Sequence, residues 1–152
     1  MAHFETDYDE LCVSLEAMLE GVPHKTANLA NASALIFDTM DDINWAGFYL
    51  IEGGRLVLGP FQGKPACTEI AVGRGVCGAT VERGEAIMVQ DVHKFTDHIA
   101  CDSASNSEIV IPLFKDSEIV GVLDIDSPSV GRFDESDLYG LLRVGKIIET
   151  IF

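Results

Sequence analysis

The sequence lacks any apolar run long enough to span a membrane. Its longest apolar stretches lie near residues 109–114 and 119–123, and each has the length of a β-strand. The first residues, MAHFETD, contain neither the basic region nor the apolar core of a secretory signal peptide. These two absences predict a cytoplasmic protein without a membrane anchor.

Basic residues are scarce. The chain carries 10 lysines and arginines against 25 aspartates and glutamates, which gives a formal net charge of −15. A surface with this charge repels the phosphates of nucleic acids and of anionic lipids, so neither is expected as a partner. The acidic residues are scattered along the chain, which is typical of a solubilising surface.

The cysteines form no CxxC pair, which argues against a zinc ribbon and against a thioredoxin-type redox site. They are Cys12, Cys67, Cys77 and Cys101. Structural disulfides are disfavoured in a reducing compartment, so these residues are either inert core thiols or reactive ones. Zinc ligation by His93, His98 and Cys101 with one more cysteine is a further alternative. Those spacings fit no common zinc pattern, and we predict neither a metal nor another cofactor.

Hydrophobic periodicity predicts one α+β domain that fills residues 1–152, without a linker or a repeat. Helices are expected over residues 8–20, 25–39 and 76–83, and from Asp134 onward with Asp137 completing a capping box. Leu138, Leu141, Leu142, Gly145 and Ile148 form the expected inward stripe of that last helix. Strands are expected over residues 44–51, 55–58, 86–90, 108–114 and 119–126. Loops are expected over residues 59–68 and 91–106.

Alternation along the strands predicts which side chains share a face of the sheet. One face is wholly apolar and must contact the helices. If neighbouring strands pair as hairpins, the other face gathers two aromatic residues and three carboxylates: Trp45, Tyr49, Glu108, Asp124 and Asp126. Aspartate has a poor β-propensity and like charges repel, so this set is unusual in a strand. A solvated outer face would explain it, as would a ligand with an ammonium group or a carboxyl that donates a proton.

Six segments form a specific combination: 44–49 (NWAGFY), 61–67 (FQGKPAC), 73–78 (GRGVCG), 98–102 (HIACD), 107–110 (SEIV) and 121–127 (GVLDIDS). This combination resembles the free methionine-R-sulfoxide reductases, which are single-domain enzymes with the GAF fold. The resemblance implies a central, mostly antiparallel sheet with helices on one face and a ligand pocket roofed by loops on the other. It also implies the activity, a thiol-dependent reduction of free L-methionine-(R)-sulfoxide to L-methionine.

The resemblance implies roles for the three cysteines that match the family. Cys101 resembles the attacking thiol, which takes the oxygen and becomes a sulfenic acid. Cys67 resembles the thiol that resolves this acid into a disulfide, to be reduced by a thioredoxin. Cys77 matches the third family cysteine, to which we assign an accessory role. Cys12 has no counterpart and is expected to be a core residue.

The resemblance also implies the substrate-binding residues. Trp45 and Tyr49 resemble the pocket for the substrate methyl group. The polar side of that pocket is expected to consist of Glu108, Asp124 and Asp126. Asp126, with Glu108 beside it, is the expected proton donor, and Asp124 is expected to bind the ammonium group or to orient the substrate. The backbone around Ile99 and Ala100 is the expected seat of the substrate carboxylate.

A GAF-type sensor that binds a small ligand without converting it is the alternative, because a fold does not fix a function. Such a sensor normally requires an output segment, and residue 152 ends the predicted last helix. The spacing of the three cysteines also has no purpose in a nucleotide sensor. We therefore expect an enzyme with free methionine-(R)-sulfoxide and thioredoxin as partners. The oligomeric state is left open, with a homodimer as one option.

Overall fold

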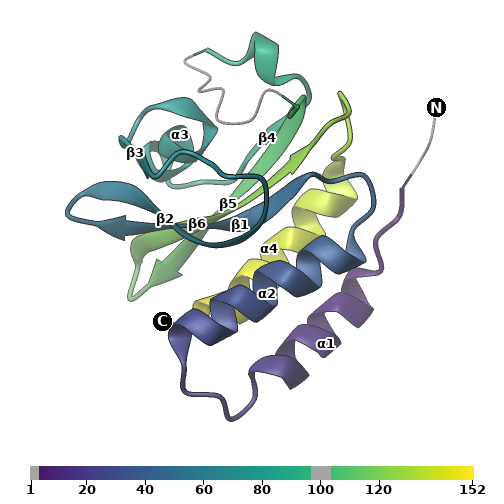
Figure 1. The fold of residues 1–152 in the computed structure, drawn as a ribbon, viewed down its shortest axis with the longest axis vertical. Coiled ribbons are helices and arrows are strands. Elements are labelled where there is room, and N and C mark those ends of the chain that lie inside the picture. The colour runs from purple at the N-terminus through teal and green to yellow at the C-terminus, as the bar shows by residue number, and fades with distance from the viewer. Residues whose placement is uncertain (1–3, 97–103) are drawn as a thin grey trace.

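The structure, a computed structural model, describes residues 4–96 and 104–152. A six-stranded antiparallel sheet forms its centre, with the strand order β3-β2-β1-β6-β5-β4 (Figure 1). The strands are β1 (Trp45–Glu52), β2 (Arg55–Gly63), β3 (Glu69–Ile70), β4 (Ile87–Val89), β5 (Ser107–Lys115) and β6 (Glu118–Ser127). The helices are α1 (Tyr8–Leu19), α2 (Lys25–Thr39), α3 (Gly75–Arg83) and α4 (Glu135–Glu149), with a 3₁₀ turn η1 (Val92–Lys94).

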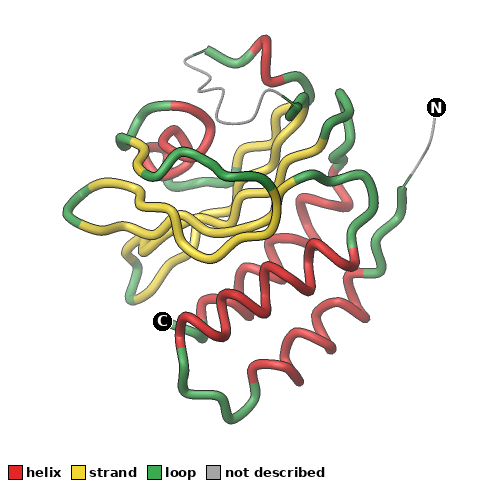
Figure 2. The backbone as a smooth tube through the Cα atoms, viewed as in Figure 1, coloured by secondary structure: helices red, strands yellow, loops and turns green. Residues whose placement is uncertain are grey.

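Three helices cover one face of the sheet. α2 and α4 pack directly on the strands, and α1 packs on the outer side of these two helices (Figure 2). The sheet side of this core consists of the apolar residues that alternation predicted: Ala46, Phe48, Ile109, Ile111, Leu113, Leu123 and Ile125. Among the described residues, no helix has the length and apolar character needed to cross a lipid bilayer.

The short helix α3 lies on the opposite face of the sheet (Figure 1). Val76 and Cys77 of this helix pack with Val110 and Val122 of the strands in a second apolar cluster. α3 thus adds a helix to the face of the sheet for which the prediction named roofing loops. Six consecutive residues of α3, from Gly75 onward, are buried, so its sequence has no single apolar stripe that would have shown its side.

Capping and turn residues set several element boundaries as predicted. α4 begins after Asp134, whose carboxylate accepts the backbone N–H of Asp137 at 3.1 Å. The Asp137 carboxylate in turn accepts the backbone N–H of Asp134 at 3.0 Å, which completes the capping box. The first hairpin turns at Gly53 and Gly54, which both have positive φ angles, and α3 ends at Gly84 in the left-handed conformation.

Three local predictions were wrong. Residues 59–63, expected as a loop, continue β2, because a β-bulge places Gly59 and Pro60 opposite the single residue Phe48. The short strand β3 occupies residues 69–70, directly after a predicted loop and where no strand was expected, and the turn η1 lies within the predicted loop over residues 91–106. On α4, Leu142 is 39% exposed and does not belong to the inward stripe.

Candidate active site

The pairing of β1, β6 and β5 brings the unusual polar residues onto one face of the sheet. Asp126 lies opposite Trp45 of β1 and opposite Glu108 of β5. Asp124 lies two residues earlier in β6, opposite Gly47, and therefore shares that face. The strands thus place together the residues that alternation predicted to share a face.

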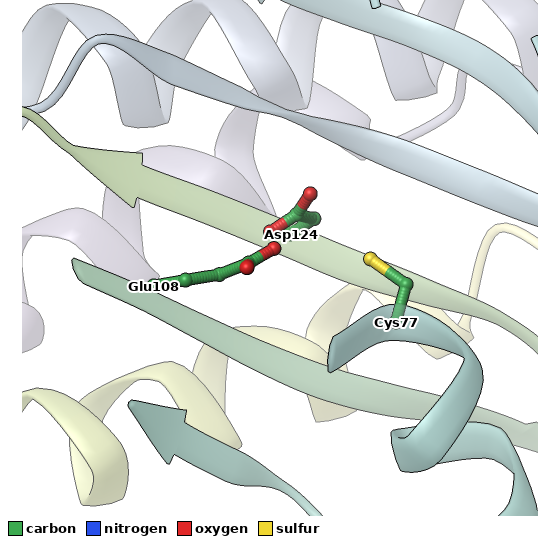
Figure 3. Close-up of side chains that lie close together, drawn as sticks. All are labelled: Cys77, Glu108 and Asp124. Carbon is green, nitrogen blue, oxygen red and sulfur yellow. The ribbon is translucent and has the colours of Figure 1, made fainter. Parts of the chain in front are cut away.

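Cys77 of α3 joins two of these carboxyl groups. Its Sγ atom and one carboxylate oxygen each from Glu108 and Asp124 lie within 4.8 Å of one another. Figure 3 shows these side chains converging from a helix and two neighbouring strands. The Asp124 carboxyl group interacts with Cys77, Glu108 and Asp126. Glu108, Asp124 and Cys77 are only 8%, 5% and 4% exposed, so this face is an interior and not a solvated surface.

Burial dominates the electrostatics of this cluster. It raises the pKa of Glu108 well above its ordinary value, and the charge of Asp124 adds to the shift. Burial also raises the pKa of Asp124, with the charge of Asp126 as the second cause. The pKa of the Cys77 thiol is raised by burial and then by Asp124. The cluster therefore favours protonated carboxyl groups, or a ligand that brings a positive charge.

A stack of aromatic rings borders the carboxyl groups. The Trp45 ring lies 6.0 Å from the Tyr49 ring and 5.0 Å from the Phe61 ring, measured between centroids, with interplanar angles of 21° and 15°. Both β1 rings donate hydrogen bonds to the segment after β2. The indole Nε1 of Trp45 donates to the carbonyl of Lys64 at 3.1 Å, and the hydroxyl of Tyr49 donates to the carbonyl of Cys67 at 2.9 Å.

Phe61 is a member of this stack that the sequence reasoning missed, because residues 59–63 were assigned to a loop. Gly47 permits the close approach, since a Cβ atom at that position would overlap the Cβ atom of Phe61. Gly47 lies between two aromatic residues on the same face of the strand. This pattern was the available sequence signal that another large side chain packs over the glycine.

The arrangement supports three chemical tasks. A buried carboxyl group that keeps its proton at neutral pH can donate it to a bound ligand. An ionised neighbour can bind an ammonium group, which also relieves the repulsion between like charges. The aromatic stack offers an apolar surface to a small substituent of the ligand.

The comparisons with known proteins agree with this geometry. The family model for the GAF domain matches residues 26–151. The free methionine-R-sulfoxide reductase of Escherichia coli (strain K12) is 52% identical over 144 residues, which cover 95% of this chain and 87% of that protein. The chain belongs to the free methionine-R-sulfoxide reductase family. This membership confirms the resemblance and the GAF fold class predicted from the sequence motifs.

Solved structures from the same family superpose closely on this member. The structure of fRMsr of Staphylococcus aureus in complex with substrate has a TM-score of 0.94 at 48% identity and covers 99% of both chains. The free methionine-R-sulfoxide reductase from Neisseria meningitidis, in complex with its substrate, has a TM-score of 0.93 at 42% identity. It matches 100% of this chain and 95% of that chain.

The cysteines of this family member have different environments. Cys67 is disulfide-bonded, whereas Cys12 and Cys77 are free thiols. Cys12 is buried in the core between the helices and the sheet, as expected for a residue without a counterpart in the family. Three predicted site residues, Ile99, Ala100 and Cys101, lie outside the described residues.

The donor atoms of Cys77, Glu108 and Asp124 are close enough together to hold a divalent cation with one sulfur and two oxygen ligands. This set differs from the zinc alternative weighed on the sequence. Of those residues, His98 and Cys101 lie outside the described part of the chain. The Nε2 atom of His93 lies 3.0 Å from the side-chain oxygen of Asn106, at hydrogen-bond distance.

Proposed function

We propose that this chain reduces free L-methionine-(R)-sulfoxide to L-methionine with electrons from its cysteine thiols. The observation that carries the proposal is the burial of Glu108 and Asp124, with Asp126 beside them, on the sheet face that also holds Trp45 and Tyr49. Family relatives named for this reaction, two of them with substrate bound, support it.

The substrate has three groups that the protein must recognise. The S-methyl group packs on the rings of Trp45 and Tyr49. The ammonium group binds Asp124, whose Oδ1 atom has no hydrogen-bond partner among the described residues. The carboxylate binds backbone N–H groups around Ile99 and Ala100, by resemblance to the family.

Reduction begins with proton donation to the sulfoxide oxygen, since a sulfoxide is a poor electrophile until it is protonated. Asp126, with Glu108 beside it, supplies this proton. The Cys101 sulfur attacks the substrate sulfur and takes the oxygen. This step releases methionine and leaves Cys101 as a sulfenic acid, the first stage of cysteine oxidation.

A second thiol closes the cycle. The Cys67 sulfur attacks the Cys101 sulfenic acid, water leaves, and a disulfide forms between the two cysteines. The disulfide bond of Cys67 in the structure supports its assignment to this step. Cys77 remains a thiol and has an accessory role beside Asp124. Thioredoxin reduces the disulfide in the cytoplasm, and the enzyme acts either as a monomer or as a homodimer.

The proposal is tested by incubating the protein with each epimer of methionine sulfoxide and dithiothreitol, followed by measurement of methionine. The R epimer is expected to be reduced, and the S epimer and N-acetylmethionine sulfoxide are expected to react at least a hundredfold more slowly. Acetylation removes the ammonium charge and leaves Asp124 unpaired, which is costly in a buried site.

If the protein were a sensor module, the same assay would give a different result. It would bind methionine sulfoxide in a calorimeter but form no methionine with any thiol reductant. That outcome, or equal turnover of the free and the N-acetylated substrate, would contradict the proposed function.

A further inference from the structure

The segment between β2 and β3 is fastened to the sheet by hydrogen bonds from two side chains of β1. Trp45 donates its indole N–H to the Lys64 carbonyl at 3.1 Å, and Tyr49 donates its hydroxyl to the Cys67 carbonyl at 2.9 Å. One backbone hydrogen bond, from the N–H of Leu58 to the carbonyl of Thr68 at 3.0 Å, holds the far end.

Tyr49 contacts the reactive part of this segment directly. Its hydroxyl bonds the carbonyl of Cys67 itself, and the ring is 2% exposed, so the hydrogen bond is shielded from competing water. Cys67 is only partly buried, and Lys64 and Pro65 before it are exposed. The side chains of Ala66 and Cys67 pack against the second apolar cluster, and the two hydrogen bonds from β1 fix the main chain beside them. The position of the Cys67 sulfur therefore depends in part on these two β1 side chains.

We infer that Tyr49 is a positioning residue for Cys67: its hydroxyl holds the Cys67 backbone so that the thiol closes the disulfide on the oxidised cysteine. The inference rests on the proposed function, in which Cys67 is the resolving thiol. It gives Tyr49 a task besides contact with the substrate methyl group, because one face of the ring borders the carboxyl cluster while the hydroxyl reaches the segment.

The step that Tyr49 assists is balanced without any further reactant. The Cys67 sulfur attacks the sulfenic sulfur of Cys101, the S–O bond breaks, and the oxygen leaves as water with the protons of the thiol and the acid. Cys67 is oxidised as the sulfenic sulfur is reduced. The rate depends on how often the two sulfurs meet in line, and a fixed segment makes this encounter more frequent than a freely moving one.

The environment of Tyr49 keeps its hydroxyl protonated, so that it can act as a hydrogen-bond donor. Burial raises the pKa of its hydroxyl above the ordinary value, and the charge of Asp124 adds to the shift. The hydroxyl therefore keeps its proton over the whole range in which the enzyme operates. The hydroxyl can accordingly donate to the Cys67 carbonyl at each stage of the cycle.

The test measures how the sulfenic acid divides between two fates. One equivalent of methionine-(R)-sulfoxide is reduced without a thiol reductant, in the presence of dimedone, a nucleophile that traps sulfenic acids. Mass spectrometry then gives the ratio of dimedone adduct to disulfide. In Tyr49→Phe, which keeps the ring, this ratio is expected to rise about fivefold to tenfold, because one buried hydrogen bond is lost. The ratio is counted per sulfenic acid formed, so a change in the rate of methionine formation does not affect it.

Two further variants separate positioning from a general loss of structure. Pro65→Gly leaves Tyr49 intact but gives the segment more freedom, and it is expected to raise the same ratio. Tyr139→Phe removes the hydroxyl of an exposed tyrosine on α4 and is expected to leave the ratio at the wild-type value. If Tyr49→Phe melts at a markedly lower temperature, the three variants are compared well below that temperature, where Tyr49→Phe is folded.

An unchanged ratio in Tyr49→Phe, with methionine still formed, would overturn the inference while leaving the proposed function intact. A rise in Pro65→Gly alone would assign the anchoring to the main chain and not to the hydroxyl, which also overturns it. If the wild-type protein forms neither methionine nor adduct, the proposed function itself fails.

Discussion

Two carboxyl groups buried in the middle of a sheet lower the stability of this chain. A valine at position 108 or 124 would fill a similar space in an apolar cluster without losing its hydration. The groups that interact with Asp124 are the carboxyl groups of Glu108 and Asp126 and the Cys77 thiol, so no cation of the described chain compensates it. Buried carboxyl groups that lower stability and have no structural role are expected to serve binding or catalysis.

Asp126 is the residue that we expect to affect the chemical step most strongly among these carboxyl groups. Asp126→Asn preserves the shape of the side chain but removes its proton-donating ability. Methionine formation in a single turnover is therefore expected to fall by roughly two orders of magnitude, with a smaller change in substrate affinity. The melting temperature should not fall, because like-charge repulsion in the cluster decreases.

Glu118→Gln serves as the matched control, since it removes an exposed carboxylate from the other end of β6. It should retain the wild-type rate. A near-normal rate in Asp126→Asn would exclude it as the proton donor. A large loss of melting temperature would instead make Asp126 structural, and Glu108→Gln would then test the alternative donor.

The cysteine roles predict distinct defects. Cys101→Ser should abolish methionine formation even with dithiothreitol, because no other side chain takes the oxygen. Cys67→Ser should still form one equivalent of methionine but should turn over poorly with thioredoxin, since only the regeneration step is lost. Cys12→Ser is the control and should turn over normally. If Cys67→Ser fails in the first turnover as completely as Cys101→Ser, the assignment of the two roles is wrong.

At the scale of elements, the sequence predicted the site best where the period of two was uninterrupted. Alternation within β5 and β6 predicted that Glu108 and Asp126 belong to the polar set of side chains. The turn length alone does not give their register, because an irregularity between Leu113 and Phe114 shifts the pairing so that Glu108 lies opposite Asp126. β2 could not be predicted in full because Gly59 and Pro60 interrupt its pattern. The prediction therefore missed Phe61, which the β-bulge brings into the aromatic stack beside Trp45.

The packing of α1 against α4 depends on a glycine that the pattern alone does not explain. A Cβ atom at Gly140 would overlap the ring of Tyr8, and that ring is held in place by a hydrogen bond from its hydroxyl to Asp137 at 2.7 Å. Gly140→Ala is therefore expected to lower the free energy of unfolding by about 1–3 kcal/mol, despite the higher helix propensity of alanine.

Gly145 on the same helix is the matched control. A Cβ atom there would lie 3.0 Å from the side-chain Cγ2 of Ile111, so this methyl group would need to shift by only a few tenths of an ångström. Gly145→Ala should therefore change the free energy of unfolding by less than about 1 kcal/mol. Urea denaturation of both variants checks the comparison, and equal effects would contradict the proposed role of the Tyr8 ring.

At the scale of the whole molecule, the buried carboxyl groups and the net charge of −15 both lower the stability of the fold as the pH rises. Carboxyl groups of the unfolded chain titrate near pH 4, whereas the folded chain holds the protons of Glu108 and Asp124 more tightly, since burial raises both pKa values. Their contribution to stability is complete below about pH 4 and is lost as the pH rises through the folded values. Asp134 acts oppositely: the hydrogen bond from Ser136 lowers its pKa, so its contribution is lost only below about pH 4.

The ligand-free protein is therefore expected to melt at progressively lower temperatures as the pH rises from about 5 to 8. The melting curves are recorded at a constant, high salt concentration, because salt screens the surface charges. The remaining pH dependence of the melting temperature then comes from the buried carboxyl groups. Asp124→Asn cannot ionise at this position, so its melting temperature should depend less on pH and should exceed that of the wild type at pH 8. Glu118→Gln, which removes an exposed charge from the same strand, should keep the wild-type slope. Parallel curves for Asp124→Asn and the wild type would mean that Asp124 is ionised and compensated in the folded protein, and would remove the reason for assigning the substrate ammonium group to it.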